Sequence, residues 1–243
     1  MPFSPKPPTT SSTRPCGLSR QHRITLGGLS LIPDLSGALI VPEFAALLVA
    51  DLHLETGAAF ARRGVHVPPY DSRASLALLE AVIATHRPRR LIFLGDTFHD
   101  GKGAARMDGA DRARLKALTD GHDTIWITGN HDPEAPQGLS GSGVDSMALG
   151  PVTLRHIPSA RLSQGFEIAG HLHPGATVVQ RNVAVKRKCF IADQRRLIMP
   201  AFGSYTGALS VSSRAFKGLF EEETCQVWLT GTTMHAFPRS RVS

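Results

Sequence analysis

Four short motifs of acidic, amide and histidine residues have the composition of a metal site. They are Asp51-Leu52-His53, Gly95-Asp96-Thr97-Phe98-His99-Asp100, Gly129-Asn130-His131-Asp132 and Gly170-His171-Leu172-His173. Each follows a short apolar run, and taken singly each is as well explained by ordinary turn residues. Their common position after such a run favours one shared site.

The chemistry of such a site follows from its donor atoms. Together the motifs supply roughly seven oxygen and imidazole ligands with no thiolate, which suits Mn²⁺, iron or Zn²⁺ better than Cu(I) or an iron–sulfur cluster. A carboxylate between two cations can bridge them. Two cations can then lower the pKa of a bound water and stabilise the attacking and leaving oxygens of a phosphoryl transfer.

The apolar runs before the motifs predict strands that are buried on both faces. Between them, residues 75–87 and 108–120 predict helices, the first ended by Pro88 and the second by Gly121. Strands that alternate with helices indicate βαβ units, and ligands of such sheets gather beyond the carboxyl ends of the strands.

After about residue 150 the helical pattern fades and only strands are expected. The sheet is therefore predicted to become mixed or two-layered in the second half of the chain. The expected strands are residues 152–156, 166–169, 177–180, 189–192, 197–199 and 227–229.

Composition bounds the class of protein. The 243 residues are 42% hydrophobic, which excludes a wholly disordered chain, and no apolar run approaches the roughly 18 residues of a membrane helix, so we expect a soluble protein with no membrane partner. Three scattered cysteines favour a reducing cytoplasm over a disulfide framework.

The net charge of +7 favours polyanionic partners such as nucleic acid, although simple solubility explains it equally well. We expect a disordered tail over residues 1–21 and one domain over residues 22–243.

In their order, the four motifs and a histidine between the third and fourth resemble the calcineurin-like metallophosphoesterases. The resemblance implies an α/β (α+β) fold, a single-domain two-sheet αββα sandwich with a dinuclear metal centre at the strand ends. It implies that Asp96 bridges the metals and that His131 stabilises the transition state or protonates the leaving oxygen, with Asp132 orienting its ring. The remaining metal ligands would be Asp51, His53 and His173 for the first metal, and Asn130, His171 and His156 for the second. His156 is assigned only from its position after residues 152–155, and a structural histidine is the alternative.

A closer resemblance, over about residues 23–238, is to the ligase-associated metallophosphoesterases, the PdeM-type clade. It rests on the stretches FHDGKGAAR and PAFGSYTGAL, together with GALIVPEF, ADLHLETGAAFARRG, TGNHDPEAPQGL and EIAGHLHP. The clade implies a Mn²⁺-dependent phosphodiesterase that acts as a DNA endonuclease in bacterial repair, encoded near an ATP-dependent DNA ligase, a helicase and an exonuclease. Thr56 stands where the clade usually has lysine, which puts one substrate contact in doubt.

Basic residues near the motifs are candidates for binding single-stranded or flexible DNA. They are Arg62, Arg63, Lys102 and Arg106, and each cluster alone is better explained as a solvated surface charge, whereas together they could form a track for the phosphate backbone. His99 and Asp100 are candidates for orienting the metal ligands. Two other functions remain open: a small-molecule phosphatase or nucleotide phosphodiesterase that uses the same centre, and a DNA-binding scaffold with structural metals.

Overall fold

The computed structural model describes residues 23–62, 64, 70–180 and 183–243. The tail expected at residues 1–21 and the candidate Arg63 lie outside the described residues. None of the helices in the described part of the chain combines the length and apolar composition needed to cross a bilayer.

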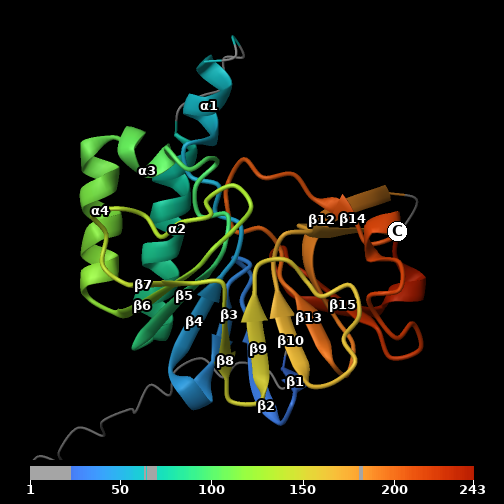
Figure 1. Cartoon of the computed structure of the whole chain (residues 1–243). Helices are drawn as coiled ribbons and strands as arrows, with labels where there is room; N and C mark the ends of the chain where they lie inside the picture. The colour runs from blue at the N-terminus through green and yellow to red at the C-terminus, as the bar shows by residue number, and fades with distance from the viewer. Residues whose placement is uncertain (1–22, 63, 65–69, 181–182) are drawn as a thin grey trace, which may run out of the picture.

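The described strands form two sheets that face each other (Figure 1). The order of the first sheet is β1 (Ile24–Leu26), β2 (Leu29–Pro33), β3 (Leu39–Val41), β4 (Ala46–Val49), β5 (Arg90–Leu94), β6 (Asp123–Ile127) and β7 (Ser142–Val144). Neighbours from β1 to β4 are antiparallel, and neighbours from β4 to β7 are parallel. The carboxyl ends of β4, β5 and β6 therefore lie along one edge.

The second sheet is mixed, as expected for the second half of the chain. Its order is β14 (Leu209–Ser210), β11 (Pro174–Gln180), β12 (Val183–Ala192), β13 (Arg196–Ile198), β10 (Phe166–Ala169), β9 (Val152–Arg155) and β8 (Ser146–Leu149). The hairpin of β15 (Gln226–Leu229) and β16 (His235–Pro238) joins it beside β12. β9 and β10 are parallel, so their carboxyl ends also share an edge.

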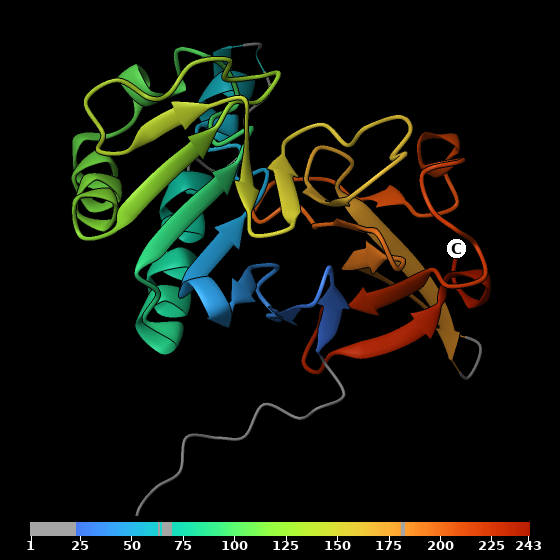
Figure 2. The same ribbon diagram turned by 60° about the horizontal axis from the view of Figure 1, so that its bottom comes forward.

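The described helices are α1 (Thr56–Arg62), α2 (Asp71–His86), α3 (Gly103–Arg106) and α4 (Gly109–Asp120), and the 3-10 turns are η2 (Pro42–Phe44), η3 (Arg214–Phe216) and η4 (Arg239–Arg241). The outer face of the first sheet is covered by α2 and α4, whereas α1 projects beyond the edge where its strands end (Figures 1 and 2). The outer face of the second sheet is covered by the C-terminal segment around η3, with Phe216 and Phe220 buried against it. The predicted sandwich is confirmed, and its second outer layer is built of turns rather than long helices.

Alternating side chains of the central strands explain why both faces are covered. Leu48 of β4 and Ile92 of β5 pack between the sheets, whereas Leu47 and Phe93 pack under the helices. The Phe93 ring stacks on Trp126, with ring centroids 4.2 Å apart. Because every second residue faces a different layer, these strands are apolar throughout, as the sequence indicated.

Sequence reasoning found α2 and α4 and the main strands of the second half. It did not predict α1, α3 or the short strands β7, β8, β14 and β16. Each of these elements is seven residues or fewer, which is too short for a repeating apolar pattern to identify it.

Replacement of Leu48 by alanine tests the packing between the sheets. Leu48 is fully buried, so Leu48→Ala should lower the free energy of unfolding by about 3 kcal/mol through lost burial and a cavity. Leu78→Ala, at a side chain that is 38% exposed on α2, should change it by less than about 0.5 kcal/mol. Urea unfolding of both variants measures the difference, and equal losses would contradict this packing.

Candidate metal centre

Two clusters of ligand atoms lie at the edge where the strands of both sheets end. Asp51, His53 and His173 form one cluster, and Asp96, His156 and His171 form the other. Within each cluster the ligand atoms all lie within 4.8 Å of one another. Residues from three of the motifs and from the end of β9 are thus brought together at one edge.

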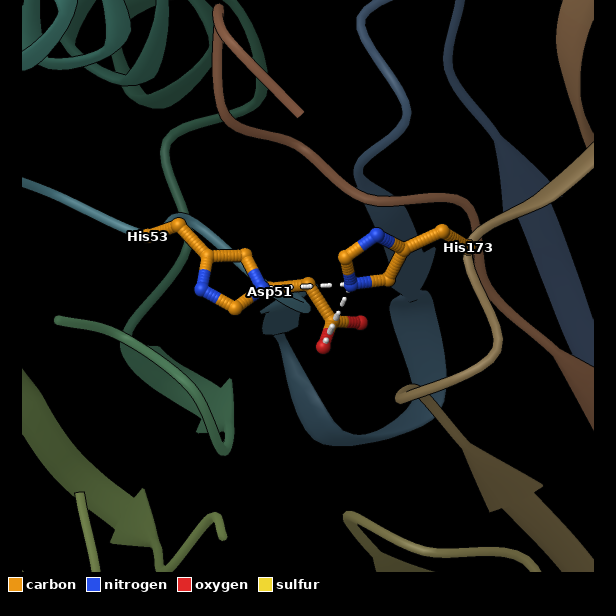
Figure 3. A group of neighbouring side chains, drawn as sticks. All are labelled: Asp51, His53 and His173. Carbon is orange, nitrogen blue, oxygen red and sulfur yellow. Dashed lines mark hydrogen bonds and ion pairs between the residues drawn. The ribbon is translucent and has the colours of Figure 1, made fainter. Parts of the chain in front are cut away.

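The first cluster is built around Asp51, which follows β4. Figure 3 shows the His53 and His173 rings approaching this carboxylate from opposite sides. His173 Nε2 lies 3.2 Å from Asp51 Oδ1 and 3.2 Å from His53 Nε2. The amide of His171 donates to Asp51 Oδ2 over 2.9 Å, which fixes the ends of the two sheets to each other.

The second cluster is built around His156, which follows β9 and is 3% exposed. Its Nδ1 lies 2.9 Å from the carbonyl oxygen of Leu94, which places a proton on Nδ1 and directs Nε2 toward the other ligand atoms. Three further ligand atoms surround that Nε2: Asn130 Oδ1 at 3.0 Å, His171 Nδ1 at 3.2 Å and Asp96 Oδ2 at 3.3 Å.

Asp96 faces both clusters. Its Oδ2 lies 3.3 Å from His156 Nε2 and 3.9 Å from His53 Nε2, while its Oδ1 accepts a hydrogen bond from the His131 amide over 2.9 Å. A single carboxylate oxygen between two groups of imidazoles has the position of a bridging ligand.

The backbone around the clusters adopts a conformation that side chains rarely take. Of the eight described non-glycine residues with positive φ, five are candidate ligands. These are Asp51, His53, Asp96, His171 and His173, with φ between 45° and 70°. Such strain costs energy and persists where the surrounding structure imposes it, often at a functional site.

Two motif glycines make room for the ligands. A β-carbon on Gly170 would stand 2.7 Å from Asp51 Oδ2, and one on Gly95 would stand 2.5 Å from the His156 ring. Neither position tolerates a side chain without moving a ligand. Gly95 and Gly170 therefore allow the ligands to approach the backbone closely, in addition to forming the turn.

Protonation states within the clusters suit a divalent cation. Burial lowers the pKa of His53 to about 4, so its imidazole is neutral at pH 7. Burial alone would raise the pKa of Asp96, but the hydrogen bond and the charge of His156 outweigh it and lower the pKa to about 2. Buried Asp51 Oδ1 and His53 Nδ1 have no hydrogen-bond partner among the described residues. The neutral His53 ring, the ionised Asp96 carboxylate and the unpaired Asp51 Oδ1 are groups that bound divalent metals would satisfy, so the residues fit such a centre.

His131 lies beside the clusters, although Asp132 does not orient it as expected. Its Nε2 is 4.0 Å from Asp96 Oδ2, and its Nδ1 is 2.8 Å from the backbone carbonyl of His99. Asp132 instead accepts hydrogen bonds from the amides of Thr97 and Phe98, over 2.8 and 3.1 Å. Burial raises the pKa of Asp132 to about 6. The expectation for Asp132 was wrong because its carboxylate holds the neighbouring motif rather than the histidine.

Asp100 is also not used as expected. It pairs with Arg106 and with Arg62, with nitrogen–oxygen distances of 2.7 and 3.4 Å, and accepts from the Lys102 amide. Asp100 therefore holds Arg62 and Arg106 in place near the centre rather than orienting a candidate metal ligand. His99 contributes its carbonyl oxygen to His131, which no spacing rule in the sequence could have indicated.

A loop that sequence reasoning did not assign supports Asp51 from behind. The amides of Phe202 and Gly203 donate to the carbonyls of Ala50 and Asp51. Lys188 donates to the carbonyls of Ala201 and Gly203 and to a third acceptor in this loop, and burial lowers its pKa to about 8. Lys188 therefore acts inside the protein, not on a substrate-binding surface.

Thr56 likewise has an internal role. It is buried at the start of α1, and its hydroxyl donates to the carbonyl of His53 over 2.5 Å. A threonine at this position thus stabilises the turn that carries a candidate ligand.

Comparison with known proteins agrees with this fold. Among solved structures, the chain is similar to the nuclease MPE from Pseudomonas putida, with 26% identity and a TM-score of 0.67 over 88% of this chain and 98% of that chain. A phosphoesterase from E. coli, Yfce, matches 79% of this chain and 98% of its own with 13% identity and a TM-score of 0.39, which is too low to carry an argument. No family model matches the chain, and no curated protein matches it in sequence.

The resemblance to the metallophosphoesterases is confirmed by the sandwich and by the match to nuclease MPE. With paired aspartate and histidine clusters at the strand ends, the chain is a hydrolase of the phosphoesterase class.

Replacing Asp96 tests its position between the clusters. Asp96→Asn should weaken Mn²⁺ binding at both clusters, by at least about tenfold, because it removes a charge that both share. His173→Ala should weaken only the cluster that contains Asp51. Calorimetric titration with Mn²⁺ counts the remaining sites. An Asp96→Asn variant that loses one site and keeps the other at full affinity would contradict the bridging position.

The metal-free protein should show an unusual histidine titration. Because burial lowers the pKa of His53 from 6.5 to about 4, its ring should stay neutral until the pH falls to about 4. The unfolded chain binds that proton at higher pH, so the contribution of this ring to the free energy of unfolding should decrease as the pH falls from 6.5 to 4. NMR of the His53 ring carbons measures the titration, with His53→Asn identifying the signal. A midpoint near 6.5 would contradict the burial argument.

Proposed function

We propose that the chain is a phosphodiesterase that uses two divalent metal ions, Mn²⁺ by preference, and acts as a DNA endonuclease in bacterial repair. The observation that carries the proposal is the position of Asp96 Oδ2, which faces His53 in one cluster and His156 in the other. Support comes from the similarity to a nuclease over 88% of the chain. The preference for Mn²⁺ rests on the resemblance to the ligase-associated clade, because the mixed oxygen and nitrogen donors suit iron and Zn²⁺ as well.

Seven side chains would hold the metals: Asp51, His53 and His173 on one side, Asn130, His156 and His171 on the other, and Asp96 between them. When bound, two such cations supply Lewis acidity that activates a water and neutralises a phosphate. The leucine carbonyl that holds His156 Nδ1 keeps the ring in the tautomer that presents Nε2.

His131 is the residue of the chain best placed to move a proton. Its side chain is 42% exposed, so a substrate can reach it. Because Nδ1 is held by the His99 carbonyl, Nε2 is the atom that would carry a proton to the leaving oxygen. The backbone hydrogen bond fixes the ring without requiring an acidic partner.

The basic character of the chain supports a polyanionic substrate. Arg62, Lys102 and Arg106 lie beside the loop that follows β5, and their charge exceeds that of the single Asp100 among them. These cations would contact phosphates without reading sequence. A role in repair, a location in the cytoplasm and an association with an ATP-dependent DNA ligase, a helicase and an exonuclease rest on the clade resemblance alone.

Cleavage of a circular single-stranded DNA tests the proposed activity. Metal-free protein is loaded with Mn²⁺ and incubated with the circle, an aryl phosphodiester and an aryl phosphomonoester, beside Asn130→Ala. Nicking of the circle by the wild type alone supports the endonuclease, because a circle offers no ends to an exonuclease. Hydrolysis of the small esters with an intact circle would favour a small-molecule phosphatase or nucleotide phosphodiesterase, and binding of the circle without any cleavage would favour a scaffold.

Replacement of His131 tests the proton transfer. His131→Asn should reduce turnover by about 10²- to 10⁴-fold because the leaving oxygen loses its proton donor, while Mn²⁺ content stays at the wild-type value. Elemental analysis beside the rate measurement separates the two effects. An equal loss of metal in His131→Asn would show that His131 is a ligand instead.

A further inference from the structure

A pocket lies beside the candidate metal centre, between two loops that carry its residues. One wall runs from Phe98 to Ala105, in the loop that follows β5 and Asp96. The other wall runs from Asp132 to Gln137, in the loop that follows Asn130 and His131. Both walls therefore belong to loops that also carry residues of the candidate metal centre.

The walls of this pocket are fixed without any ligand. Arg112 of α4 donates to the carbonyl of Ala104 in one wall and to the carbonyl of Gln137 in the other. Asp132 binds the Thr97 and Phe98 amides and so ties the bases of the two loops together. A preformed pocket costs little ordering on binding.

The surface of the pocket is mostly apolar, with methyl groups and rings from Ala104, Ala105, Pro133, Ala135 and Pro136. Charged residues also line it, but Arg112 and Asp132 bond to the loop backbone and Asp100 pairs with Arg106. Lys102 and Glu134 are exposed beside the opening. Such a lining fits a flat, weakly polar ring better than it fits a charged group.

A second depression lies beside the segment 100–105. It shares Asp100, Gly101, Lys102 and Ala105 with the pocket and adds Arg62 and Arg106. Three cations and one carboxylate leave a net charge of +2 in this depression. The cations beside this depression would contact a phosphate next to a base held in the pocket.

We infer that the pocket lined by Ala104, Ala105, Pro133 and Pro136 binds the base of a nucleotide that flanks the scissile phosphate. We name it the base pocket. The inference rests on the proposed function, since it takes the phosphodiester at the metal centre to belong to a nucleic acid. Because its lining is apolar, the base pocket recognises the presence of a base and not its identity.

Filling the base pocket tests the inference. Ala105 is exposed at the opening, so Ala105→Trp places an indole there without disturbing a buried contact. Binding is measured by fluorescence anisotropy with Mn²⁺ present, in the His131→Asn background so that the ligand is not consumed. The two ligands are a short labelled oligothymidylate and a chain of equal length whose sugars carry no base.

The parent should bind the oligothymidylate about tenfold more tightly than the abasic chain. Addition of Ala105→Trp should remove this difference, and the smaller Ala105→Leu should reduce it. Ala84→Trp, at an exposed alanine of α2 outside the pocket lining, should leave it unchanged. Comparing the two ligands cancels any effect of the new side chain on phosphate binding.

Two results would overturn the inference: no preference for bases in the parent, or a preference that survives Ala105→Trp in a protein with wild-type circular dichroism and Tm. Failure of the proposed function is seen separately, as absence of Mn²⁺-dependent nicking by the wild type. A wild type that nicks DNA but binds both ligands equally would refute the base pocket alone.

Discussion

The site depends on one carboxylate that must face two groups of imidazoles at once. Asp96 lies at the end of a central strand, is 2% exposed, and has its Oδ2 directed between His53 and His156. A buried negative charge is costly unless positive groups or hydrogen bonds compensate it. The His131 amide supplies one such hydrogen bond, and the remaining oxygen is left for metals.

The two-sheet sandwich brings the groups that surround Asp96 to one edge. Three parallel strands of one sheet and two of the other end at a common edge, so ligands distant in sequence meet there. The positive φ angles and the close glycines are local costs, and the apolar layers on both sides of β4 and β5 hold the strands that bear them. A direct link from the His171 amide to Asp51 keeps the two halves of the site in register.

Sequence patterns predicted the parts of this arrangement that follow a strand. Asp51, Asp96, Asn130 and His171 come just after apolar runs, and a strand end fixes where such a residue can lie. The role of the His99 carbonyl could not be predicted, because every residue has a carbonyl and spacing does not show which one is used. The true partners of Asp132 and Lys188 depend on loops that meet only in the folded chain. The two-sheet sandwich could be expected from the family resemblance, whereas α1 and α3 are too short to leave a pattern.

A crystal structure of the protein grown with Mn²⁺, with anomalous difference maps recorded at the manganese edge, would show whether Asp96 bridges two metal ions. Two anomalous peaks are expected, one beside Asp51, His53 and His173 and one beside Asn130, His156 and His171, with the Asp96 carboxylate contacting both. A single peak, or two peaks of which only one is contacted by Asp96, would contradict it.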